Sequence, residues 1–117
     1  MLICKGIAQI HQLIMEQITA FINKIESEDQ ISSSTRKAYS SDLLKFSRYL
    51  QNNQKSRQSI QQITLKHFFR FLEHEKKLGL KPSTLHRRRV SLKKFAEFLS
   101  DRGELEKSSV QEVAGWQ

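Results

Sequence analysis

The residues from Lys81 to Phe95 form the most informative functional stretch of this sequence, and their types indicate the binding of a polyanion. The run KPSTLHRRRVSLKKF contains six Lys or Arg, one His and no acid. Guanidinium and ammonium groups neutralise phosphates, and on a helix they can also enter the major groove of DNA. A solvated helix face usually mixes Lys with Glu, so the missing acids favour a binding surface.

The same run reads as the start of an amphipathic helix. Leu92, Phe95 and Leu99 recur at helical spacing and are predicted to be buried. Arg88 falls on the same side of the helical wheel, where an unpaired charge would be costly to bury. We therefore expect the first two turns to project beyond the partner helices, so that Arg88 faces outward.

The remaining cations of this helix fall on its other faces. Arg87 and Lys94 are seven residues apart on one face, and Arg89 and Lys93 share another. Lys81 precedes the helix, whose first amides also favour anions. These five residues are predicted to contact nucleic-acid phosphates.

Other reactive side chains form no pattern specific to catalysis or metal binding. The two His-x-x-Arg matches, His67/Arg70 and His86/Arg89, are expected by chance in so basic a chain. The four histidines are scattered and no acid cluster joins them, so no metal site is predicted. Cys4 is the sole cysteine, which excludes an intrachain disulfide. No Gly-rich phosphate loop is present, and we predict no catalytic residue and no cofactor.

Charge and length set the class of partner. The chain has 117 residues and a net charge of +8, which favours nucleic acid or an anionic membrane. Residues 32–117 carry 18 Lys or Arg against 8 acids, so the basic character belongs to the later helices. No apolar run approaches the roughly 20 residues that span a bilayer, and no signal peptide is recognised. A cytoplasmic protein with no membrane partner and no small-molecule substrate is expected.

Helical periodicity dominates the chain, and strand signals are scarce. Four helices are predicted, at about residues 8–26, 34–52, 64–78 and 82–101. Ser33 or Ser34 is expected to cap the second helix and Thr64 the third. Gly79 and Gly103 are expected to end the third and fourth. The third helix is predicted to bury Leu65, Phe68, Phe69 and Leu72. Tyr39 is expected in the core, and residues 108–117 are expected to be a linker or a short fifth helix.

Three of these helices carry residues of a known pattern. The second has Thr35, Ala38, Tyr39, Asp42, Leu43, Phe46 and Leu50; the third follows Ile60, Ile63 and Thr64 with Phe68, Phe71 and Leu72; the fourth has Ser83, Thr84, Leu85, Arg87, Arg88, Leu92, Lys93, Phe95, Phe98 and Leu99. In register, they resemble the N-terminal core-binding domain of tyrosine recombinases and phage integrases, over about residues 10–107. The resemblance implies an all-α, four- to five-helix, SAM-like orthogonal bundle, with residues 1–107 as the DNA-binding domain.

The resemblance also implies a function. In that family the domain forms half of a clamp around duplex DNA at a recombination site, beside other recombinase protomers. The other half is a catalytic domain carrying a nucleophilic tyrosine, which this chain is expected to lack, with residues 108–117 leading toward it. Helices corresponding to the second and fourth face the major groove. The implied DNA contacts are Thr84, Arg87, Arg88 and Lys93, with Arg36, Lys37, Ser41 and Lys45 on the second helix.

Two other interpretations remain open from the residues alone. A stand-alone regulator would join the third and fourth helices through the short turn 79–81 as a helix-turn-helix, and would bind a palindromic operator. A helical interaction module would use the Ile-rich stripe of the first helix to pair with a partner or with itself. Sedimentation at several concentrations separates self-pairing from packing within the chain.

Overall fold

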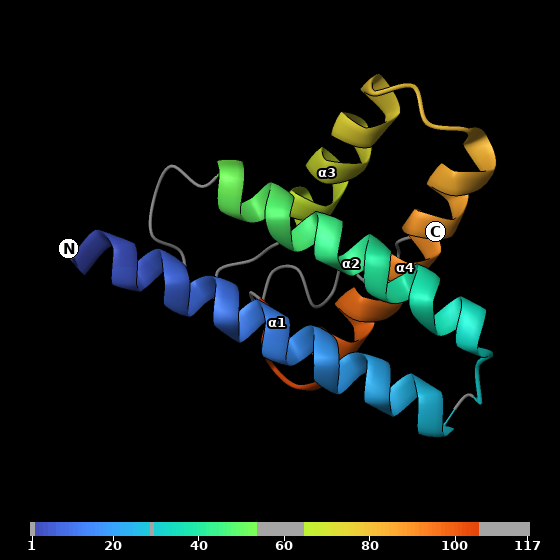
Figure 1. Cartoon of the computed structure of the whole chain (residues 1–117), viewed down its shortest axis with the longest axis horizontal. Coiled ribbons are helices and arrows are strands. Elements are labelled where there is room, and N and C mark those ends of the chain that lie inside the picture. Colours follow the sequence, from blue (N-terminus) through green and yellow to red (C-terminus); the bar gives the residue numbers. More distant parts are fainter. Residues whose placement is uncertain (1, 29, 54–64, 106–117) are drawn as a thin grey trace. The chain divides into compact units, whose positions relative to one another are not determined.

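The computed structural model describes residues 2–28, 30–53 and 65–105, and the side chains of residues 14–28, 30–52 and 65–105. These residues form four helices, α1 (Leu2–Glu28), α2 (Ser33–Asn53), α3 (Leu65–Lys77) and α4 (Pro82–Asp101), and no strand (Figure 1). The all-α prediction is confirmed. The proposed fifth helix, at residues 108–117, and the proposed cap Thr64 lie outside the described residues.

The chain folds as two compact units, Met1–Ile60 and Gln61–Gln117. In the first unit, α1 and α2 run antiparallel and pack against each other (Figure 1). The predicted isoleucine stripe of α1 is buried from Ile14 to Ile25, and Leu43 and Phe46 of α2 are fully buried. Burial of an apolar side chain of this size contributes roughly 1.5–3 kcal/mol, so this shared stripe holds the hairpin together.

The starts of α1 and α2 differ from the prediction. α1 begins at Leu2, six residues earlier than expected, and continues through Gly6, although an interior glycine costs about 1 kcal/mol relative to Ala. The cap of α2 is Ser32, not Ser33 or Ser34. The Ser32 hydroxyl accepts a hydrogen bond from the Thr35 amide at 3.2 Å, and Ser33 is already helical. In a row of three serines, the sequence cannot separate the cap from the first helical turn.

In the second unit, α3 packs against α4 around aromatic side chains. Phe68 and Phe95 are buried, with ring centroids 6.4 Å apart. The prediction that α3 buries Phe69 is wrong, because Phe69 is 42% exposed while Phe71 is 1% exposed. The buried side of α3 runs through Leu65, Phe68 and Phe71, which leaves Phe69 at its edge.

Glycines end α3 and α4, as predicted. Gly79 and Gly103 adopt φ of 83° and 69°, a left-handed conformation that favours glycine. After α4, the Glu104 amide donates to the Leu99 carbonyl at 2.8 Å and the Gly103 amide to that of Ser100 at 3.0 Å. These two hydrogen bonds fix the direction in which the chain leaves α4, and Leu105 is buried directly after them.

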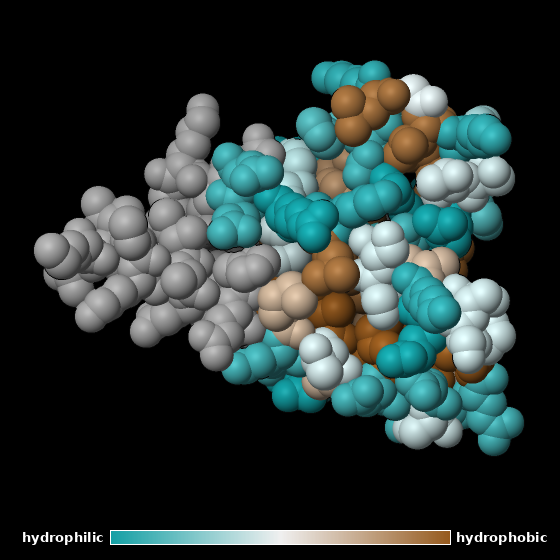
Figure 2. All heavy atoms as spheres, in the orientation of Figure 1, coloured by the Kyte–Doolittle hydropathy of each residue, from teal (hydrophilic) through white to brown (hydrophobic). Residues whose placement is uncertain are grey.

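The described surface is mostly hydrophilic, with apolar atoms showing between α1 and α2 in the orientation of Figure 2. A second apolar area lies at the turn between α3 and α4, where Leu78 is 65% exposed. Among the described residues, no helix is both long and apolar enough to cross a bilayer.

Candidate nucleic-acid interface

The start of α4 positions the first group of predicted contacts. Lys81 precedes the helix in an extended conformation, with φ of −62° and ψ of 144°, and Pro82 occupies the first turn. Proline suits this place because its missing N–H would have no partner there. The Leu85 amide then donates to the Lys81 carbonyl at 3.0 Å. Lys81 is exposed and Thr84 is half-buried, so only the lysine presents its full side chain to solvent.

Four further cations of α4 lie at its surface. Arg87, Arg89 and Lys94 are exposed, and Lys93 is half-buried. No acid interrupts the sequence from Lys81 to Lys94. Acids appear on α4 only later, where Glu97 and Asp101 are exposed. From its start to Lys94, α4 therefore carries basic residues and no acid. We call Lys81, Arg87, Arg89, Lys93 and Lys94 together the α4 surface.

The structure contradicts the prediction that Arg88 contacts DNA from an outward-facing position. Arg88 does not face outward: the residue is only 3% exposed, and its Nη1 atom lies 2.7 Å from Oε1 of Glu75 on α3. The Glu75 side chain is 8% exposed, so both charges are buried together. A buried charge is tolerated when an opposite charge pairs with it. Arg88 is thus a link between α3 and α4 and is removed from the candidate interface.

Glu75 is the residue that the sequence reasoning missed, although a signal for it exists. Glu75 follows Phe68 and Phe71 by seven and four residues, so it continues the buried side of α3. Arg88 lies on the buried side of α4 three residues after Leu85. Opposite charges on the apolar sides of two consecutive helices predict that the two side chains meet.

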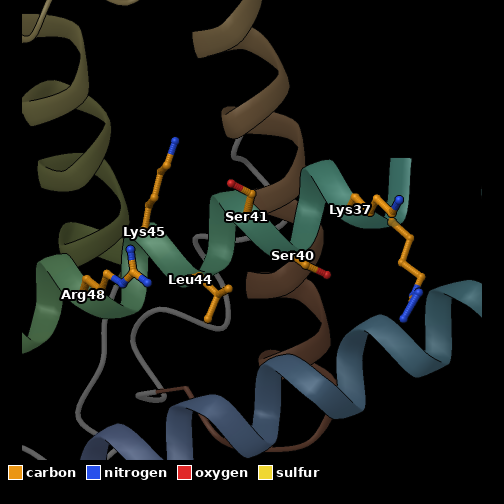
Figure 3. A pocket seen from close by; sticks show the side chains of 7 residues that line it. Lys37, Ser40, Ser41, Leu44, Lys45 and Arg48 are labelled. Carbon is orange, nitrogen blue, oxygen red and sulfur yellow. The ribbon is translucent and has the colours of Figure 1, made fainter. Parts of the chain in front are cut away.

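A second group of cations lies on α2. One side of this helix forms a hollow lined by Arg36, Lys37, Ser40, Ser41, Leu44, Lys45 and Arg48, and Figure 3 shows this row along the helix. The hollow brings together all four α2 residues predicted as contacts, Arg36, Lys37, Ser41 and Lys45. It adds Arg48, a cation three residues after Lys45 that the prediction omitted. We call these residues the α2 surface.

The α2 surface has cations and hydroxyl groups but no acid among its lining residues. The one acid of α2, Asp42, is fully buried and so does not face the hollow. Glu26 of α1 does approach: its Oε2 lies 2.9 Å from Nε of Arg36, and both side chains are about half exposed. Exposed pairs of this kind contribute only about 0–1 kcal/mol, so a phosphate can compete for Arg36.

Within the described ranges, no three His, Cys, Asp or Glu residues stand close enough to hold a metal ion. Tyr39 and Tyr49 are both half-buried on α2. The described residues of the two candidate surfaces are cations, with hydroxyl groups and Leu44 on α2, while Asp42 and Glu75 are buried.

The model of the phage integrase N-terminal SAM-like domain matches residues 18–103, more than two thirds of the chain. The chain belongs to this family. The match begins within α1 and ends after α4, so both candidate surfaces lie inside the SAM-like domain. No curated protein and no solved structure matches the sequence. The SAM-like domain is the N-terminal, non-catalytic part of integrases, which agrees with the resemblance seen in the sequence.

Proposed function

We propose that this SAM-like domain binds duplex DNA as the DNA-binding module of a site-specific tyrosine recombinase. In this role it clamps DNA at the recombination site, together with other recombinase protomers. It does no chemistry itself and serves DNA integration or recombination. The observation that carries the proposal is the acid-free α4 surface in a chain of the integrase family.

The α4 surface supports phosphate binding through its composition and exposure. Three of its arginine and lysine side chains, Arg87, Arg89 and Lys94, are exposed within little more than two turns. Each cation that neutralises a phosphate releases counterions, and this makes binding strongly dependent on salt. Lys81 extends the same surface to the start of the helix.

The α2 surface supports a second contact. Lys37, Lys45 and Arg48 are exposed along a single side of α2, and Ser41 lies among them. Lysine and arginine supply charge to the phosphates, while a serine hydroxyl donates to a phosphate oxygen. A helix with these groups tracks a sugar–phosphate backbone without needing to read bases.

The test is binding of the 117-residue chain to fluorescent duplex DNA, measured by anisotropy across a range of salt concentrations and compared with single-stranded DNA. The logarithm of the association constant should fall linearly with the logarithm of salt, with a slope of about −0.9 for each phosphate neutralised. Absence of binding at low salt would contradict the proposal.

A matched pair of variants tests where the DNA binds. Arg87→Glu/Arg89→Glu should weaken duplex binding at least tenfold and reduce the slope by about 1.8, because two phosphate contacts are lost. Lys66→Glu/Arg70→Glu changes the net charge equally at two exposed positions of α3 and should have a much smaller effect. Equal losses in both variants would mean that only net charge matters and that the α4 surface is wrongly assigned.

A further inference from the structure

The outer side of α3 carries exposed side chains that belong to neither candidate surface. Lys66, Phe69, Arg70 and Glu73 are all exposed, and they recur at i, i+3, i+4 and i+7. Because successive helical residues are rotated by roughly 100°, these four positions share about a quarter of the helix circumference, on the side opposite to the buried Phe68. We call the four residues the α3 face.

Two members of the α3 face are not accounted for by the fold of their own chain. Phe69 is 42% exposed, one of only two large apolar side chains exposed in the described part of the chain. Lys66 lies in the first turn of α3, where a cation opposes the helix dipole, and no acid lies in that turn to offset it. Neither the core of the unit nor the local stability of the helix explains these two residues, so a contact outside the chain is the better explanation.

The order of charges along the α3 face is self-complementary. Lys66 and Glu73 are two turns apart, and the midpoint between them falls between Phe69 and Arg70. When a second α3 lies antiparallel with its midpoint beside the first, Lys66 of each copy is level with Glu73 of the other. A two-fold axis relates the copies, so the ion pair forms twice and the two Phe69 rings stand side by side. A parallel arrangement would instead set Lys66 against Lys66.

We propose that the α3 face binds the α3 face of a second copy of this chain in this antiparallel arrangement. Exposed ion pairs contribute little each, and a helix of 13 residues is only about 20 Å long, so the pair is weak. It forms at protein concentrations on the order of 1 mM, which two chains also reach when a shared ligand holds them together. The isoleucine stripe of α1 does not serve this purpose from Ile14 to Ile25, because it is buried within the chain.

The test is a dilution series of the ¹⁵N-labelled 117-residue chain, followed by amide NMR shifts from tens of micromolar to about 1 mM. The shifts that change with concentration should centre on residues 66–73. Lys66→Glu sets like charges against Glu73 twice, and Glu73→Lys does the same against Lys66, so each should weaken self-association at least about tenfold. Asp101→Lys makes the same charge change at an exposed acid of α4 and should leave self-association unchanged.

Exchange of the two charges gives the sharpest test. Lys66→Glu/Glu73→Lys keeps the net charge of the wild type and restores opposite charges at both contacts, so self-association should return to within about threefold of the wild type. An equimolar mixture of the two single variants should associate more strongly than either variant alone, because opposite charges meet only in the mixed pair. Far-UV circular dichroism checks that each variant keeps its helices.

Each outcome decides the proposal without reference to DNA. Shifts of residues 66–73 that disappear in the single variants and return in the exchange variant support it. Shifts that do not change with concentration, or that centre outside α3, overturn it. Folded single variants that associate like the wild type, or an exchange variant that associates no better than they do, also overturn it. A chain that binds no duplex DNA can still pair through α3, so the proposed function and this pairing stand or fall separately.

Discussion

The buried pair of Arg88 and Glu75 sets up a direct test of how the second unit is held together. Glu75→Ala leaves the guanidinium buried without its carboxylate, and the two side chains are only 4% and 8% exposed. Removing one partner of a buried pair costs about 3–5 kcal/mol. A natural domain has a total stability of only about 5–15 kcal/mol. We therefore expect Glu75→Ala to lower the free energy of unfolding by about 3–5 kcal/mol.

The same chain offers a matched control. Glu26 pairs with Arg36 at 2.9 Å, a similar separation, but these side chains are 50% and 48% exposed. Solvent screening limits such a pair to about 0–1 kcal/mol, so Glu26→Ala should shift stability by no more than that. Urea titration followed by far-UV circular dichroism measures both variants, and an unchanged slope with urea shows that the difference is one of stability.

A double substitution separates the charge from the packing. Glu75→Leu/Arg88→Met removes both charges and keeps apolar volume, so its stability should be close to or above that of the wild type. It should also keep the salt slope of DNA binding, because Arg88 faces Glu75 and not solvent. If Glu75→Ala costs no more than Glu26→Ala, the pair does not bury its charges, and the role of Arg88 as a link between α3 and α4 is refuted.

Four further substitutions test other parts of the structure. Gly103→Ala should cost about 1 kcal/mol from its left-handed φ of 69° alone, since an added Cβ meets no atom within 4 Å; a melting curve with no shift would contradict this. Phe68→Ala should cost about 3–5 kcal/mol because Phe68 is fully buried, while Phe69→Ala should cost less than half as much in the same urea titration. Glu26→Gln removes the carboxylate that competes with phosphate for Arg36, so duplex DNA should bind more tightly at low salt. An unchanged affinity for duplex DNA would argue against the α2 surface.

Most of the fold follows from local patterns that need no knowledge of the partner helix. The isoleucine spacing of α1, the Pro82 start of α4 and the two terminal glycines each depend on a helix face or a single backbone conformation, and the structure agrees with them. The start of α2 is different, because Ser32, Ser33 and Ser34 are equivalent in the sequence. Only the backbone geometry shows that the Ser32 hydroxyl accepts from the Thr35 amide.

The candidate site was less predictable, since side-chain burial depends on residues from other helices. A helical wheel of α4 alone places Arg88 on the apolar side and shows no partner for its charge. The sequence therefore predicts that the Arg88 side chain is exposed. The partner is Glu75, thirteen residues earlier and on another helix. Arg48 was not predicted as a contact for the same reason. Its place in the α2 hollow depends on the residues around it and not on its spacing along the helix alone.

The two candidate surfaces share the lack of an acid among their own residues. On α2 the single acid, Asp42, is fully buried, so the exposed charges of that helix are all positive. On α3 the acid Glu75 is buried against Arg88, which removes one charge of each sign and leaves the net charge of the unit unchanged. The structural consequence is the placement of the remaining arginines, because Arg88 is buried while Arg87 and Arg89 stay exposed. The buried pair thus adds to the apolar contacts of Leu92 and Phe95 that set which side of α4 carries the exposed arginines.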